Sequence, residues 1–204
     1  MTQFNDLNGI HVEGHIKISD PDNGEVFVNK RNAIHYENMS LALAESLANQ
    51  GQGFISDMSF GNGGTSVDPT GIVTYLTPNS TGTNASLYNQ TFTKVVDERS
   101  VNNNDPIRNK TEIRHVSGTN YTDILVSCLL DYGEPSGQDA FDTASDTESL
   151  YVFDELGLVS SAAGTGTGKL LTHVIFHPVQ KSLNRLIQID YTVRVQSLTG
   201  FNEA

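Results

Sequence analysis

The sequence predicts a mainly β protein, an antiparallel β-sandwich or jelly-roll-like fold with one α-helix packed on it. Apolar and polar residues alternate in about eight to ten short segments, which is the period of half-buried strands. Turns and loops rich in Asn, Thr, Ser and Gly separate these segments. Only residues 33–50 carry helical spacing, and strands and helices do not alternate regularly, which disfavours a parallel α/β sheet.

The first predicted element is a hairpin near the N-terminus. Residues 10–18 alternate apolar and polar side chains, and 26–28 continue the alternation after the turn segment Asp20–Gly24. Asn23-Gly24 suits a tight turn because both residues tolerate positive φ. We therefore expect two antiparallel strands joined at this turn.

The helix is expected over residues 33–50. Tyr36, Met39, Leu43 and Leu47 are spaced three, four and four residues apart, which places them on one helical face. Gly51 provides a stop, because glycine adopts the left-handed C′ conformation without a Cβ penalty. Such a stripe normally packs inward, so the four side chains are predicted to be core.

The C-terminal half supplies the strongest strands. Residues 121–131 are apolar on both faces around Leu125–Leu130, which predicts a central strand of a sheet. Residues 170–176 and 185–195 are further strands, and in the second the side from Ile187 to Val195 is the predicted core face. Cys128, the single cysteine, is expected to be a buried small hydrophobic residue.

These elements predict one β-rich domain over 10–197, with a polar N-terminal arm at 1–9 and a tail at 198–204. The formal net charge is −12, and the 12 Lys and Arg residues are scattered. Nucleic-acid binding needs clustered cations, so no nucleic-acid partner is expected. No apolar run of 18 residues occurs, so no membrane span is expected either.

No motif in the sequence predicts an enzyme, a cofactor or a metal. Residues 163–170 depart from a phosphate-binding loop at the first glycine and at the Mg²⁺-binding hydroxyl. The pairs His11/His15 and His173/His177 lie in strands, where four residues span about 13 Å and cannot share one zinc. Surface or hairpin histidines are the expected alternative.

Carboxylates leave one question open. Asp154 and Glu155 are neighbours on a predicted strand, so their side chains should point to opposite faces and not form a catalytic pair. The acidic residues of 133–149 lie in a predicted long loop, and whether they bind calcium is not decided by their spacing.

Two blocks of the sequence together resemble a known class of proteins. The first runs from Gly24-Glu25-Val26 through Asn32-Ala33-Ile34 and the helix around Leu41–Ala44 to Phe60–Gly64; the second runs from Phe153–Leu158 through Leu170–Phe176 to the strand Ile187–Val195. Their order is similar to that in structural proteins of tailed-bacteriophage virions, assigned to tails, necks, baseplates and fibre attachments. The resemblance covers about half of the chain and supplies no catalytic residue.

The resemblance implies a non-enzymatic structural subunit at the tail, neck or baseplate of a phage particle. Such a subunit would assemble in the host cytoplasm as a symmetric homo-oligomer, with other virion structural proteins as partners. The loop Gly61, Asn62, Gly63 and Gly64 is the predicted subunit contact, open toward a neighbouring chain. A capsid decoration protein and a host-carbohydrate-binding module remain alternatives, although the chain has no Trp and its Tyr residues are dispersed.

Overall fold

The computed structural model describes residues 9–135 and 150–198. The elements follow in this order: β1 (Gly9–Ser19), β2 (Val26–Arg31), β3 (Ala33–Ile34), α1 (Tyr36–Leu47), β4 (Ile55–Gly61), β5 (Thr65–Val67), β6 (Val73–Tyr75), β7 (Gln90–Val95), β8 (Lys110–His115), β9 (Tyr121–Leu130), β10 (Leu150–Ser160), β11 (Thr172–Ser182) and β12 (Ile187–Leu198). Within the described residues α1 is the only helix. The predicted mainly β fold is confirmed.

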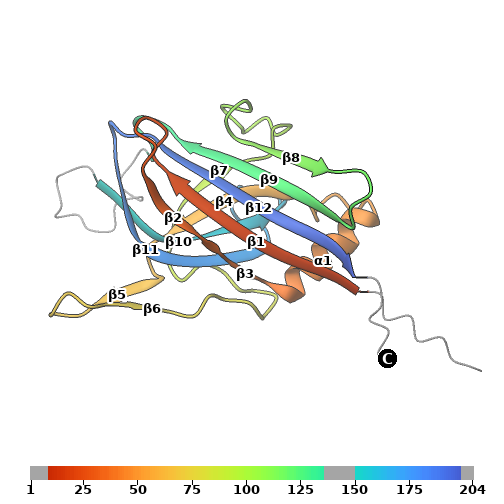
Figure 1. Ribbon diagram of the computed structural model, residues 1–204, viewed down its shortest axis with the longest axis horizontal. Helices are drawn as coiled ribbons and strands as arrows, with labels where there is room; N and C mark the ends of the chain where they lie inside the picture. The colour runs from red at the N-terminus through yellow and green to blue at the C-terminus, as the bar shows by residue number, and fades with distance from the viewer. Residues whose placement is uncertain (1–8, 136–149, 199–204) are drawn as a thin grey trace, which may run out of the picture.

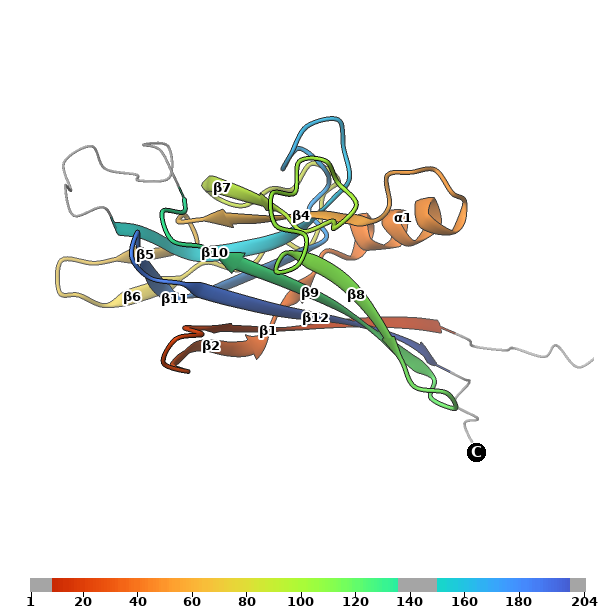
Figure 2. The ribbon, with the colours of Figure 1, turned by 90° about the horizontal axis from the view of Figure 1, so that it is seen from above.

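Two antiparallel five-stranded sheets form the body of the molecule (Figures 1 and 2). The first sheet has the order β2-β1-β12-β9-β8, and the second has the order β3-β11-β10-β4-β7. A separate two-stranded sheet, β5-β6, extends from one end, and α1 lies at the other. The arrangement is that of a β-sandwich, in which each sheet buries one face.

The first sheet confirms the strand predictions made for both ends of the chain. β1 pairs with β2 through the predicted turn, where Gly24 has a φ of 76°. β12 lies between β1 and β9, and its side chains from Ile187 to Val193 alternate between the core and the outer face as predicted. β9 has a neighbour on each side, so the segment that is apolar on both faces is an interior strand.

The core lies between the inner faces of the two sheets. Ile16 and Ile18 from the first sheet and Met58 from the second are completely buried. On the second sheet the rings of Phe60 and Phe153 meet edge to face with centroids 5.4 Å apart, a favoured aromatic geometry. Cys128 is part of the same core, as predicted.

The helix is shorter than predicted, and its buried face is rotated relative to the predicted apolar stripe. Met39 is buried and Leu43 is half-buried, but Tyr36 is 70% exposed and Leu47 is 86% exposed, so the prediction of these two as core is wrong. Asn38 is buried in their place, because its Nδ2 donates a 2.9 Å hydrogen bond to the Leu170 carbonyl. The face of the helix that packs inward therefore consists of Asn38, Met39 and Ala42, with Leu43 beside them.

The second sheet is covered on its outer face by loops. Segments on both sides of the β5-β6 hairpin and part of 161–169 contact this face, and Leu87 packs there against Val159 and Leu170 in a small apolar cluster separate from the main core. The amide of Gly166 donates to Asp57 Oδ2 over 3.1 Å. These polar segments are thus bound to the sheet.

Several predictions concern residues outside the described part of the chain. This group comprises the acidic segment 136–149, almost all of the arm at 1–9 and residues 199–204 of the tail.

Within residues 9–135 and 150–198, no helix combines the length and apolar character needed to cross a membrane.

Candidate functional site

A β-bulge in β10 brings two adjacent carboxylates under the same loop. The register between β10 and β11 shifts between Phe153 and Glu155. A bulge interrupts the two-residue period of a strand, so successive side chains no longer point to opposite faces. Asp154 and Glu155 both bind the backbone that follows β4, and the prediction that they face opposite sides is therefore wrong.

Glu155 is the centre of this cluster and is completely buried. Its Oε1 accepts hydrogen bonds from the amides of Gly63 and Asn89, over 3.1 and 2.8 Å. Its Oε2 accepts from the Tyr88 amide over 3.0 Å and lies 2.9 Å from His173 Nε2. Burial by itself would raise the pKa of Glu155, but the bonds from His173 and the three amides together hold it below its ordinary value.

His173 is completely buried beside Glu155, so its prediction as a surface histidine is wrong. Its Nδ1 accepts a 2.8 Å hydrogen bond from the amide of Asn79. An imidazole nitrogen that accepts carries no proton, so Nε2 carries the proton and donates a hydrogen bond to Glu155 Oε2. The neutral ring thus joins the covering loop to the sheet. His11, His15 and His177 are exposed, as predicted.

Asp154 binds the next part of the loop. Its carboxylate accepts from the amides of Gly64 and Thr65 over 2.9 and 2.8 Å, and also from the Thr65 hydroxyl. Burial raises the pKa of Asp154, although these bonds favour its charged form. The two neighbouring carboxylates together fix the backbone from Gly63 to Thr65.

The predicted contact loop, Gly61 to Gly64, is the segment held by these carboxylates. Gly61 and Gly64 are buried, Asn62 and Gly63 are half-buried, and Asn62 exchanges hydrogen bonds with Asn89. A Cβ on Gly64 would lie 2.9 Å from the Ile175 side chain and 3.1 Å from that of Glu155, so glycine permits this close approach. Its role as a subunit contact stays a prediction.

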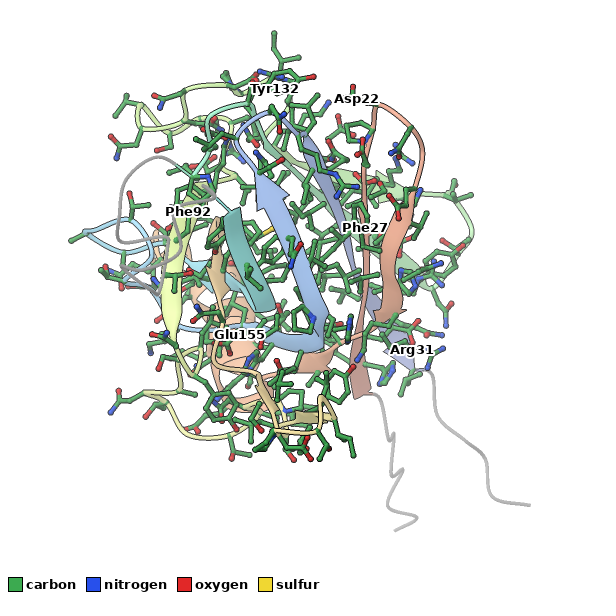
Figure 3. The ribbon with its side chains drawn as sticks, turned by 90° about the vertical axis from the view of Figure 1, so that its left-hand side faces the viewer. Asp22, Phe27, Arg31, Phe92, Tyr132 and Glu155 are labelled. Atoms are coloured by element: carbon green, nitrogen blue, oxygen red, sulfur yellow. The ribbon has the colours of Figure 1, made fainter. Side chains whose placement is uncertain are left out.

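The loop leads directly into the β5-β6 hairpin, which projects from the body (Figures 1 and 2). Val67, Ile72, Tyr75 and Leu76 are exposed on and beside this hairpin. Figure 3 shows Glu155 close to the hairpin's base. The buried carboxylates therefore position a hairpin that presents apolar side chains to solvent.

Hydrogen bonds within the chain occupy the polar atoms of the cluster. Each Glu155 oxygen has two partners, and each ring nitrogen of His173 has one. This geometry fastens loop to sheet, and the pair is closed to solvent. Among the described residues, no group of three or more His, Cys, Asp or Glu side chains is placed to hold a metal ion.

Sequence reasoning identified Asp154 and Glu155 but missed their association with each other and with His173. The sequence signal for this association was weak, because a bulge has no fixed sequence signature and the partners are distant in sequence. Gly64 and Asp154, for example, are 90 residues apart.

No protein-family model, curated protein or solved structure matches this chain.

Proposed function

We propose that the chain is a non-enzymatic structural subunit of a tailed-phage virion, located at the tail, neck or baseplate and assembled through symmetric contacts between copies. The observation that carries the proposal is the β5-β6 hairpin, which presents apolar side chains at the end of the molecule and is fixed at its base by buried carboxylates. The sequence resemblance described above supplies the virion context.

An isolated two-stranded hairpin gains little from its own contacts in water. Here Val67 pairs with Val73, and β6 is flanked by the exposed apolar residues Ile72 and Leu76. Contiguous exposed apolar groups are typical of protein–protein contact sites. A neighbouring subunit that covers them would remove this apolar surface from water and stabilise the hairpin.

The buried cluster explains why such a hairpin could serve assembly. Glu155 and Asp154 fix the backbone just before β5, so the hairpin is held on the sheet before any partner arrives. A preorganised contact element loses less conformational entropy on binding than a free loop does. The segment Gly61–Gly64 would then hold the base of the hairpin, and the exposed apolar side chains on and beside its strands would make the contact.

The test compares the mass of the chain in solution with its place in the particle. Light scattering after size-exclusion chromatography should give an oligomer for the unmodified chain and a smaller species for Ile72→Ser. Ile107→Ser is the matched control, since Ile107 is also exposed but belongs to the loop before β8. An equal effect of both substitutions would contradict a contact through the hairpin.

Antibody labelling of intact particles tests the virion assignment independently. Label at the tail, neck or baseplate supports the proposal, and label spread over the head would favour a capsid decoration protein instead. Absence of the chain from purified particles would overturn both assignments.

A further inference from the structure

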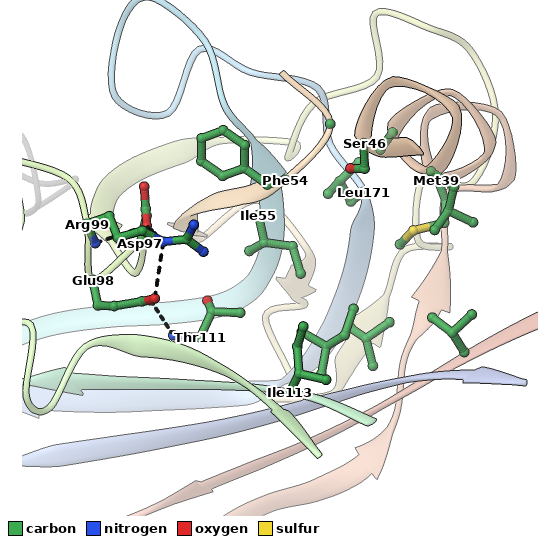
Figure 4. A pocket seen from close by; sticks show the side chains of 16 residues that line it. Met39, Ser46, Phe54, Ile55, Asp97, Glu98, Arg99, Thr111, Ile113 and Leu171 are labelled. Atoms are coloured by element: carbon green, nitrogen blue, oxygen red, sulfur yellow. Dashed lines mark hydrogen bonds and ion pairs between the residues drawn. The ribbon is translucent and has the colours of Figure 1, made fainter. Parts of the chain in front are cut away.

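A cavity of about 330 Å³ opens between the two sheets at the end that carries α1 (Figure 4). α1 forms one wall, through Met39 and Leu43, and the first sheet forms the opposite wall, through Ile124 and Val193. Ile55 of β4 closes it from the second sheet. The volume lies within the range of sites for small organic molecules, which are concave and mostly apolar.

The cavity communicates with solvent at the edge of the first sheet. Ile113 on the edge strand β8 pairs with Ile124, and both side chains line the cavity. Ile113 is nevertheless 75% exposed, so the sandwich is open beside it. Phe54, on the other side of the opening, is also exposed. An apolar molecule can therefore enter without unfolding either sheet.

Charged groups lie at the side of the cavity formed by residues 97–99. Arg99 Nε is 3.4 Å from Glu98 Oε1 and 3.8 Å from Asp97 Oδ1. Glu98 also accepts a hydrogen bond from the Thr111 amide, 3.3 Å away. Figure 4 shows the Arg99 guanidinium directed from its loop toward Phe54 and Ile55. Two carboxylates and one guanidinium give this side a formal charge of −1.

These features specify the chemical class of an occupant. The walls made by Met39, Leu43, Ile124 and Val193 offer dispersion contacts and no charge, so the body of the ligand must be apolar. The charged side offers donors from Arg99 and acceptors from Glu98, which suit a hydroxyl or amide head group. A carboxylate head would meet a net charge of −1 from Asp97, Glu98 and Arg99, so it should bind more weakly than a neutral head.

We propose that this cavity binds an uncharged amphiphile, with its apolar chain between α1 and the first sheet and its neutral polar head beside Glu98 and Arg99. A cavity of about 330 Å³ has room for a short alkyl chain. The site is independent of the β5-β6 hairpin, which lies at the opposite end of the molecule.

Two probes with the same tail test the head-group assignment. Octan-1-ol and octanoate are titrated against the chain by isothermal calorimetry, with NMR shifts of the Ile113 and Val193 methyl groups to locate the site. Octan-1-ol should bind saturably and about tenfold or more tighter than octanoate, equivalent to about 1.4 kcal/mol or more. Equal affinities would overturn the head-group assignment, and absence of saturable octan-1-ol binding would overturn the site.

A matched pair of substitutions on α1 tests the location. Ser46 and Ser40 are both exposed, but only Ser46 lines the cavity. Ser46→Phe should weaken octan-1-ol binding about tenfold or more by filling the cavity with a ring, whereas Ser40→Phe should leave it unchanged. Equal effects of the two would contradict the proposal. A loss of self-association in Ser46→Phe, without octan-1-ol binding to the unmodified chain, would assign the cavity to a second copy and overturn the ligand site.

Discussion

His173 Nε2 lies 2.9 Å from Glu155 Oε2, and both side chains are completely buried on the outer side of the second sheet. The pair connects β10 to β11 and, through the amides of Gly63, Tyr88 and Asn89, to the loop that covers them. A buried carboxylate is retained at low cost only when its hydrogen bonds are complete. The integrity of the loop and the stability of the fold therefore depend on the same group.

Removing the Glu155 carboxylate should destabilise the chain strongly. Glu155→Ala leaves three amides and His173 Nε2 without their acceptor, and breaking a buried pair typically costs about 3–5 kcal/mol. Urea unfolding followed by circular dichroism measures the change in the free energy of unfolding. Hydrogen exchange should also accelerate at the Gly63, Tyr88 and Asn89 amides before global unfolding.

Glu112→Ala is the control for this change, because Glu112 forms an exposed ion pair with Lys110 on an edge strand. Exposed pairs contribute little, so this variant should unfold at nearly the same urea concentration as the unmodified chain. A Glu155→Ala variant equally close to the unmodified chain would contradict the anchoring role of the cluster.

The Glu155 pKa also predicts how stability depends on pH. Because the folded-state pKa is lowered, ionised Glu155 favours the folded state, and this contribution is complete above the unfolded value of about 4.3. It is lost as the pH falls through the folded-state pKa. Glu155→Gln cannot ionise, so the stability difference between the unmodified chain and this variant should shrink below about pH 4.

Urea midpoints of both proteins measured from neutral pH down to about pH 3 test this dependence. The pKa of Asp154 is raised by burial, so protonation of Asp154 has the opposite effect on stability. Asp154 is present in both proteins, and taking the difference between them removes its direct contribution. A difference that stays constant over the whole range would show that Glu155 is not the group that titrates.

The parts of the fold that the sequence predicted are those with a regular period. Ile16 and Ile18 alternate with exposed residues because one face of β1 is buried over its second half, and the same holds for β12 from Ile187 to Val193. The site lacks this regularity: the bulge at Asp154 breaks the period, and its partners come from distant segments. On α1, burial of the polar Asn38 through Leu170 is likewise invisible to an apolar pattern.

The rotated face of α1 can be tested by three substitutions. Met39→Ala should cost about 2–5 kcal/mol, since Met39 is buried between the helix and the sheets. Leu47→Ala should change the free energy of unfolding by less than about 0.5 kcal/mol, because Leu47 is exposed at the helix end. Leu43→Ala should fall between them. Thermal or urea unfolding gives the order, and a larger cost at Leu47 than at Met39 would restore the original stripe as the core face.

The thiol of Cys128 should be unreactive in the folded chain. It lies on β9 opposite Ile189 of β12, fully buried, and burial raises the pKa of its thiol to about 12. The thiolate is the nucleophile, so near neutral pH the thiol is both inaccessible and protonated. An aromatic disulfide reagent should react with one thiol in concentrated urea and only slowly in buffer, at a rate limited by opening of the sheet. Rapid reaction in buffer would show that β9 and β12 separate readily, and would contradict the closed core described for this part of the sandwich.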